Sequence, residues 1–305
     1  DAQPDVVRDA PESQLLAVTK MPTMAAYAAE EQVVDARSHS APVSRRRQLA
    51  AYTIGLGPTV LMWYFCVVLK MAIPAVFAFH LLMVVSMLGF CAAFREDPRS
   101  CLPSRAEVRR SLCQCGLSFL SLSVGGVAIY IGCRTGSTPG EYLGVPLESL
   151  RSLIDLFGVK EDPVPYVFFC VYFTLANPTL EELFWRSFLH RELGCDQPFQ
   201  KAVLAHDYAL YHLFITSSLM PHWFSILCAY PFLVAFGLVL DRIARDQRFG
   251  VITAFGVHAG MDLAAAFWIM DLRYGWLDFL QDVPQELGPA AGVVTAVASS
   301  YAGAS

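Results

Sequence analysis

Six ionisable side chains interrupt segments of this chain that are otherwise almost free of charge. Ionisable groups are rare inside membrane-spanning segments, and those that occur there are candidates for a functional site. Here they come from three separate segments, so a fold that brings the segments together would create one polar site in apolar surroundings. The six residues are Glu181, Glu182 and Arg186, then His212, and then His258 and Asp262.

The spacing of these residues predicts which of them face each other. Side chains four residues apart lie on the same face of a helix, as do Glu182 and Arg186, which are predicted to pair. His258 and Asp262 have the same spacing, so Asp262 can orient or charge-stabilise the imidazole, or bind substrate itself. Glu181 is rotated by about 100° from its neighbour around the helix, so it can point into the bundle.

The chemistry that suits these groups is activation of a water molecule. A carboxylate in an apolar site is a stronger base than one in water, and two neutral imidazoles can hold the water or a developing oxyanion. These groups suffice for amide hydrolysis without a covalent intermediate, and we expect no cofactor. The chain has no HExxH motif, but a divalent metal held by Glu181, His212 and His258 stays open as an alternative.

The segments that must position these residues read as transmembrane helices. Hydrophobic residues make up 55% of the 305 residues and charged residues 16%, against roughly 25% charged in soluble proteins. About 20 apolar residues cross a bilayer as a helix. The composition excludes a soluble globular enzyme, a nucleic-acid binder, a disordered protein and an outer-membrane barrel. Candidate spans lie near residues 49–69, 72–94, 112–133, 164–190, 202–220, 222–240 and 250–270, with a weak eighth near 285–303.

The predicted fold is all-α, a polytopic transmembrane helix bundle of seven or eight spans. Residues 1–48 predict a disordered tail, residues 49–275 the bundle, and residues 276–305 a C-terminal segment. Lys and Arg gather in cytoplasmic loops. The arginines at 45–47 therefore predict a cytoplasmic N-terminus for this multi-pass membrane protein, and the later loops alternate consistently with it.

Three of the polar residues are predicted to lie at a similar depth in the bilayer. Glu181, His212 and His258 are ten, eleven and nine residues from the predicted cytoplasmic ends of their spans. At about 1.5 Å per residue, this places them roughly 13–17 Å deep. We expect a buried polar cavity that opens toward the cytoplasm and laterally toward lipid.

Structural interpretations of the same residues compete with the functional one. Thr179 and Glu182 have the spacing of a capping box, so a helix could begin after Pro178. A long helix kinked at the proline is the better prediction, because residues 164–177 alone are too short to span. Other polar side chains are interpreted as structural or interfacial; they are His80, His190, His206, Asp207 and His222.

Three ordered motifs on separate spans resemble a known family. They are Glu181-Glu182-x-x-x-Arg186, Tyr208-x-x-x-His212 and His258-x-x-x-Asp262. Together they resemble the CPBP group, which comprises the CAAX prenyl endopeptidases and the bacteriocin-processing or immunity proteins, over a core of about residues 110–270. The family usually has Phe where this chain has Tyr208. Asp262 stands where the family has Asn or Asp, and Asp is more typical of the broad family than of the dedicated CAAX enzymes.

The resemblance implies a role for each residue of the motifs. Glu181 would activate the water, His212 and His258 would position it and stabilise the oxyanion, and Asp262 would complete the catalytic set. Glu182 and Arg186 would support them.

The expected function is that of an intramembrane endopeptidase. Its expected partners are membrane lipid and a lipidated peptide, with a prenylated CAAX C-terminus as the best substrate, and no nucleic acid. The alternatives are a catalytically silent membrane scaffold or immunity-like protein and a proton-coupled transporter, against which the absence of a visible internal repeat counts.

Overall fold

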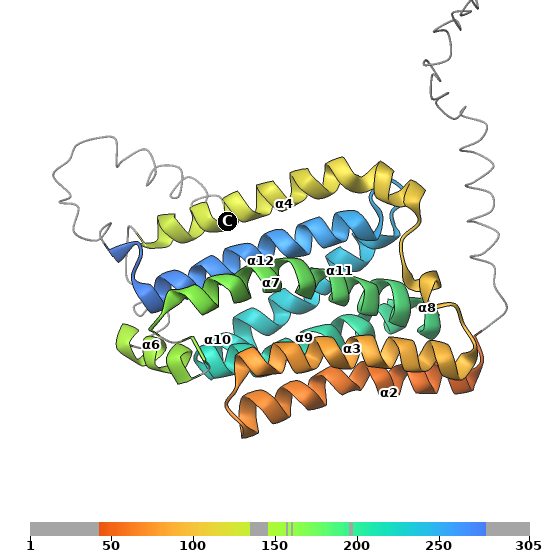
Figure 1. The fold of residues 1–305 in the computed structure, drawn as a ribbon, viewed down its shortest axis with the longest axis horizontal. Helices are drawn as coiled ribbons and strands as arrows, with labels where there is room; N and C mark the ends of the chain where they lie inside the picture. The colour runs from red at the N-terminus through yellow and green to blue at the C-terminus, as the bar shows by residue number, and fades with distance from the viewer. Residues whose placement is uncertain (1–42, 135–145, 157, 160, 195–197, 279–305) are drawn as a thin grey trace, which may run out of the picture. The chain divides into compact units, whose positions relative to one another are not determined.

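The computed structural model describes residues 43–134, 146–156, 158–159, 161–194 and 198–278 (Figure 1). Helices make up almost all of this part of the chain, and no strand occurs within these ranges. The all-α prediction is therefore confirmed. The predicted tail up to residue 42 and the weak eighth span near 285–303 lie outside the described residues.

The first two helices run as an antiparallel pair. Helix α2 (Arg45–Met62) continues as the π-helical segment η1 (Trp63–Val68), and α3 (Ala72–Phe94) follows after a short turn. Helix α2 begins three residues before the predicted end of the tail at residue 48. The reason is an N-cap, since the Ser44 side chain accepts a hydrogen bond from the Arg47 backbone N–H at 3.4 Å.

Helices α4 (Arg105–Arg134) and α12 (Gly250–Tyr274) pack along their lengths, as Figure 1 shows. Gly256 and Gly260 of α12 allow this close approach. A Cβ atom at either position would collide with backbone atoms of α4. His258 lies two residues from each glycine and therefore on the opposite side of α12. The contact between α4 and the glycines thus turns His258 away from α4 and toward the rest of the bundle.

The segment with the two glutamates is one long helix. After the short helix α6 (Leu147–Leu156), which lies between the predicted spans 112–133 and 164–190, α7 (Pro163–Glu181) continues through η3 (Glu182–Leu189) and α8 (His190–Leu193). The capping-box interpretation is wrong, because Thr179 lies inside the helix and its Oγ1 donates to the Leu175 carbonyl at 2.6 Å.

The hydrogen-bonding pattern of this helix changes from α to π at the two glutamates. Pro178 has no N–H to donate, and four residues later the α-helix widens into the π-helical segment η3. Such π-segments inside helices are frequent at functional sites. The widening changes the direction of the side chains around Glu181 and Glu182.

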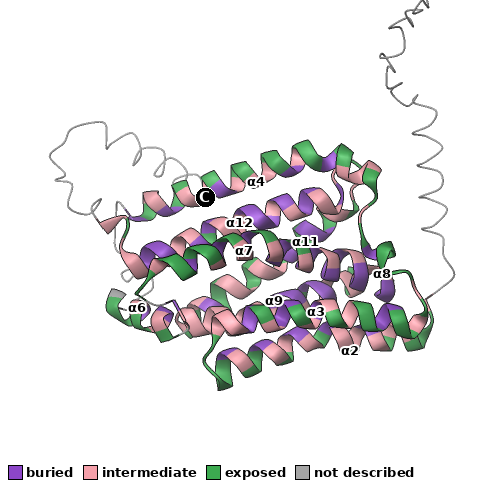
Figure 2. Cartoon of the chain, in the orientation of Figure 1, coloured by how far each residue is buried: buried purple, intermediate pink, exposed green. Residues whose placement is uncertain are grey.

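The remaining helices complete the bundle. Helix α9 (Pro198–Leu219) carries His212, and α10 (His222–Phe224), η4 (Ser225–Ala229) and α11 (Tyr230–Arg245) form the next continuous segment. Figure 2 shows buried residues turned toward the centre of the bundle and exposed ones on its outside. Many exposed side chains are large and apolar, for example Leu81, Leu120, Phe168 and Leu227.

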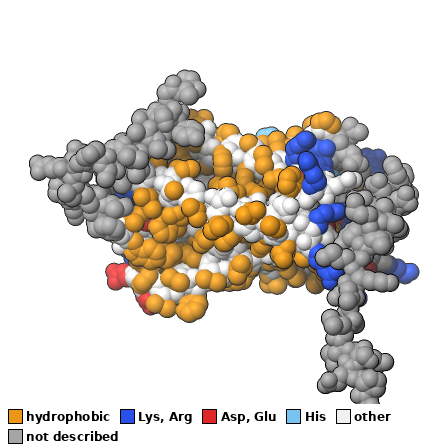
Figure 3. Space-filling view, turned by 90° about the horizontal axis from the view of Figure 1, so that it is seen from above, with side chains coloured by type: hydrophobic (Ala, Val, Ile, Leu, Met, Phe, Trp, Pro, Cys, Tyr) orange, Lys and Arg blue, Asp and Glu red, His pale blue; other side chains and the backbone are white. Residues whose placement is uncertain are grey.

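The surface pattern is that of an integral membrane protein. Figure 3 shows apolar side chains over the middle of the face in view, with Lys and Arg gathered toward one end. Within the described ranges, five helical segments are long and apolar enough to cross a membrane. They are Arg45–Val68, Ala72–Phe94, Pro98–Arg134, His222–Arg245 and Gly250–Tyr274.

Five of the seven strongest predicted spans are thus confirmed by length and hydropathy. The predicted spans 164–190 and 202–220 are helical but are not among the five. These two helices carry the two glutamates, Arg186 and His212, so the polar groups that mark the candidate site also lower the apolar character of the helices that hold it.

Candidate active site

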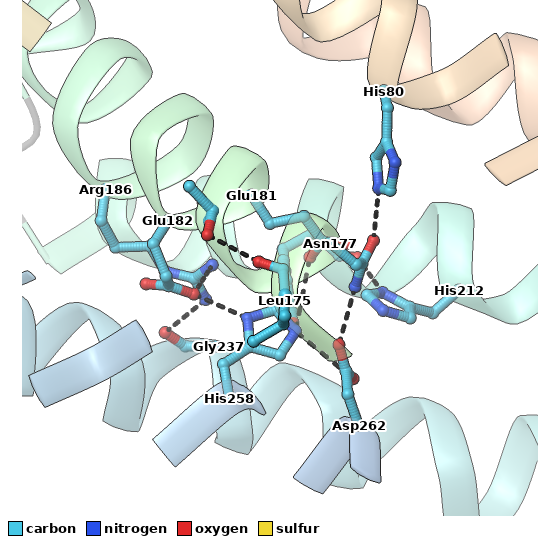
Figure 4. A network of polar contacts seen from close by, with 12 residues as sticks. His80, Leu175, Asn177, Glu181, Glu182, Arg186, His212, Gly237, His258 and Asp262 are labelled. Atoms are coloured by element: carbon cyan, nitrogen blue, oxygen red, sulfur yellow. Dashed lines mark hydrogen bonds and ion pairs between the residues drawn. The ribbon is translucent and has the colours of Figure 1, made fainter. Parts of the chain in front are cut away.

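Glu182 joins two of the predicted residues through one oxygen atom. Its Oε1 accepts a hydrogen bond from Nη1 of Arg186 at 3.1 Å and another from Nδ1 of His258 at 2.8 Å (Figure 4). All three side chains are buried. Since a carboxylate can only accept, Nδ1 of His258 carries a proton and Nε2 faces the other way. The predicted pairing of Glu182 with Arg186 is confirmed.

Three polar groups of other side chains surround Nε2 of His258. Nε2 lies 3.7 Å from Oε2 of Glu181, 3.7 Å from Oδ1 of Asp262 and 3.5 Å from the hydroxyl of Tyr208. These separations exceed ordinary hydrogen-bond lengths. A water or substrate oxygen placed between Nε2 and these groups could form hydrogen bonds with several of them at once.

Glu181 and Glu182 each have one buried carboxylate oxygen without a hydrogen-bond partner in the described ranges, and that of Glu181 is the one that faces Nε2 of His258. The side chain of Glu181 is 1% exposed. Within the described part of the chain, Oε2 has no hydrogen-bond partner. A buried carboxylate oxygen without a partner is unusual. As predicted, Glu181 points into the site while Glu182 pairs beside it.

His212 reaches the same cavity from α9. Its Nδ1 donates to the backbone carbonyl of Tyr208 at 2.8 Å, because a carbonyl can only accept. In the neutral ring, Nε2 is then an acceptor. His212, Glu181 and His258 all line one cavity, so the structure brings the three predicted residues together.

Three residues of the network, Asn177, His80 and Tyr172, were not predicted as site residues. The Nδ2 amide of Asn177 donates to Oδ2 of Asp262 at 3.0 Å, so its Oδ1 accepts from Nε2 of His80 at 2.9 Å. Nδ1 of His80 accepts in turn from the Tyr172 hydroxyl at 2.6 Å. Asn177 is uncharged, so a search for ionisable groups misses it, although it lies one helical turn before Glu181.

The other polar residues lie outside this cavity. His206 is exposed on α9 and bonds the Tyr230 hydroxyl at 2.9 Å. His190 lies near the end of its helix, 3.8 Å from Asp241 and 2.7 Å from Arg245. Neither these residues nor Asp207 and His222 line the cavity.

The cavity beside the site has a volume of about 320 Å³ and is lined mainly by apolar side chains. It extends from the site toward the end of the bundle that holds α6, where Tyr166, Phe169, Met220 and Ile269 line it. The expectation of a polar cavity is wrong, since its lining is mainly apolar, whereas the opening toward the cytoplasm and toward lipid stays a prediction. Nearer the basic end, Trp185, Arg186 and Tyr208 help to line a separate small pocket of about 10 Å³, room for about one water molecule.

The ligand set for a metal is not assembled in the described ranges. No group of three or more His, Cys, Asp or Glu side chains there is arranged to hold a metal ion. Nδ1 of His258 and Nδ1 of His212 are both engaged with protein oxygens, which leaves Nε2 of each ring for a further ligand. The chemistry proposed below uses the side chains themselves.

Fold and site together define a multi-pass helical membrane protein with buried glutamates and histidines around one cavity. The sequence model of the type II CAAX prenyl endopeptidase Rce1-like family matches residues 163–264, about a third of the chain. The match runs from the start of α7 into α12 and contains all six candidate residues. It confirms the predicted resemblance to the CPBP group and supports a CAAX-type intramembrane protease. Comparisons with curated proteins and with solved structures gave no match.

Proposed function

We propose that this protein is an intramembrane endopeptidase that hydrolyses a peptide bond with a water molecule activated by Glu181. The observation that carries the proposal is the free Oε2 of Glu181, buried and 3.7 Å from Nε2 of His258 at the polar end of a large cavity. The family match to residues 163–264 supports it.

In the proposed reaction, Oε2 of Glu181 accepts a proton from the water as its oxygen bonds to the carbonyl carbon. The π electrons of the carbonyl group move onto its oxygen, which becomes the oxyanion of a tetrahedral intermediate. When the intermediate collapses, the C–N bond breaks and Glu181 returns the proton to the leaving nitrogen. The products are a new carboxylic acid, which then loses its proton to the amine or to solvent, and a new amine, and Glu181 is regenerated.

The neighbouring groups position and stabilise these species. Glu182 is paired with Arg186 and holds His258 through Nδ1. With a second proton on Nε2, shared with Asp262, His258 donates to the oxyanion. The acceptor Nε2 of neutral His212 holds a hydrogen of the attacking water. In this assignment Glu181 is the glutamate that is not paired with Arg186, which suits it to be the base.

The cavity supports a substrate with an apolar part. Its lining is predominantly apolar and aromatic, the composition of sites that bury hydrophobic ligands. We therefore keep a prenylated CAAX C-terminus as the substrate, with the scissile bond at the polar end and the apolar part in the cavity. The basic end of the bundle, where α2 begins with the arginines at 45–47, is the proposed cytoplasmic end.

The experiment is cleavage by purified protein in lipid nanodiscs. The peptides are a farnesylated CAAX peptide, the same peptide without the lipid, and an unrelated hydrophobic membrane peptide. Wild type should cleave the farnesylated peptide fastest. A matched control is Glu148→Gln, which neutralises an exposed carboxylate of α6 and should keep wild-type activity. A folded wild-type protein that cleaves none of the three contradicts the proposal and favours a catalytically silent scaffold.

A further inference from the structure

The Tyr208 hydroxyl is a polar group of the site that the reaction above does not use. Tyr208 is 2% exposed, and its hydroxyl lies 3.5 Å from Nε2 of His258. We propose that Tyr208 is a further catalytic residue, which donates a hydrogen bond to the carbonyl oxygen of the scissile bond as that oxygen gains charge. This inference rests on the proposed function.

The ring of Tyr208 is held on several sides, so the position of its hydroxyl is fixed before substrate binds. The guanidinium carbon of Arg186 lies 4.3 Å from the ring centroid, and the rings of Trp185 and His212 lie 6.1 and 4.8 Å away between centroids. Helix α11 closes another side at Gly237, where an added Cβ would lie 3.0 Å from Cδ1 of Tyr208. Donors fixed in this way stabilise developing charge without reorganising.

Tyr208 also contacts both candidate histidines. Its backbone carbonyl accepts from Nδ1 of His212 at 2.8 Å, and its hydroxyl faces Nε2 of His258. The hydroxyl thus lies beside the nitrogen that is 3.7 Å from Oε2 of Glu181. A carbonyl oxygen within reach of Nε2 is therefore also within reach of Tyr208.

The hydroxyl has a proton to offer. Hydrogen bonds donated by hydroxyl groups are usually 2.5–3.0 Å long, so the 3.5 Å separation from His258 is a weak contact. Buried tyrosine hydroxyls normally have a good partner. Tyr208 lines the cavity, so a substrate oxygen can supply one.

The donated hydrogen bond changes no covalent bond of Tyr208. The proton stays on the phenol oxygen while the carbonyl oxygen gains the π electron pair, and the bond shortens and strengthens as the charge develops. It is released when the C–N bond breaks and the carbonyl re-forms. The contribution therefore falls on kcat rather than on ground-state binding.

The test compares Tyr208→Phe with wild type on the best peptide found for the protein. This variant keeps the ring that packs on Arg186 and removes only the hydroxyl. We expect kcat to fall by roughly 10- to 100-fold with KM within about twofold, since one donor to an oxyanion contributes on this scale or above. The control Tyr230→Phe removes a hydroxyl bonded to His206 outside the cavity and should leave both constants unchanged.

A second measurement separates direct donation from an effect through His258. A phosphinate analogue carries tetrahedral oxygens where the carbonyl and water oxygens would lie. Its Kd should rise in Tyr208→Phe by about the factor that kcat/KM loses. A kcat loss with unchanged phosphinate affinity overturns the inference, as does wild-type kcat in the variant.

The failure of this inference is distinguishable from failure of the proposed function. If wild type cleaves and Glu181→Gln does not, while Tyr208→Phe cleaves like wild type, only the role of Tyr208 is wrong. If wild type cleaves no peptide and binds no phosphinate, both fail together.

Discussion

Nδ1 of His258 lies 2.8 Å from Oε1 of Glu182, while the free oxygen of Glu181 faces the opposite nitrogen of the same ring at 3.7 Å. Two adjacent glutamates therefore face the two nitrogens of one imidazole, and only Glu182 forms a hydrogen bond with it. The side toward Glu182 is closed by a hydrogen bond and an ion pair with Arg186. The side toward Glu181 is open to the cavity. This division predicts different consequences for loss of each carboxylate.

Neutralising Glu182 should destabilise the fold. Glu182→Gln leaves the buried Arg186 guanidinium without its anion, and breaking a buried ion pair costs about 3–5 kcal/mol. Thermal unfolding in nanodiscs should show a clear loss of stability. The control Arg248→Gln breaks an exposed pair with Asp246, where we expect little change. Equal effects of the two variants would contradict the importance of the buried pair.

Removing Asn177 should disconnect Asp262 from helix α3. Asn177→Ala leaves the buried Nε2–H of His80 unpaired and frees Oδ2 of Asp262. We expect a loss of about 1–3 kcal/mol in stability and roughly 10-fold or more in kcat. Thr174→Val, one turn earlier on α7, removes a buried hydroxyl that has no partner in the described ranges and should be close to neutral. An Asn177→Ala variant that matches wild type in both measurements would remove Asn177 from the network.

The contact between α4 and α12 should tolerate no side chain at Gly256. In Gly256→Ala the added methyl group meets the Cys115 backbone, so we expect a loss of at least about 1–3 kcal/mol and a displaced His258. Gly116→Ala on α4 has open space around it and should be neutral or stabilising. Unfolding temperatures of the two variants measure the difference, and a stable Gly256→Ala would show that the helices can separate without harm.

Filling the apolar cavity should weaken the binding of an apolar substrate group. Ala266 is buried and lines the cavity at a distance from the glutamates along α12, so Ala266→Phe should raise KM for the farnesylated peptide about 10-fold. The same peptide without the lipid should be affected less. Leu120→Phe, on the outside of α4, is the matched control. Equal losses for both peptides would place the lipid group elsewhere.

The sequence predicts the helices and the local pairs well for a physical reason. Scarcity of charge marks each span, and a four-residue spacing on one helix suffices to predict that Glu182 pairs with Arg186. The contact between Glu182 and His258 joins residues 76 positions apart and depends on how two helices pack. No periodic pattern encodes that packing.

The sequence does not predict the direction in which the cavity extends, for a different reason. Side chains that face lipid and side chains that face an apolar cavity have the same composition, so Phe169 and Phe168 look alike although one lines the cavity and the other is exposed. Asn177 was not predicted as a site residue because an amide carries no charge. The short helix α6 was not predicted because its ten residues are too few for a membrane span.

The cleavage rate of Glu181→Gln is the sharpest test of Glu181 as the base. The substitution keeps the shape of the side chain and removes the base, and Glu181 has no ion pair with Arg186 or Lys to lose in the described structure. With wild-type thermal stability as the criterion of folding, we expect a rate at least about 100-fold below wild type on the same peptide. A folded Glu181→Gln protein that cleaves at the wild-type rate would show that Glu181 is not the base.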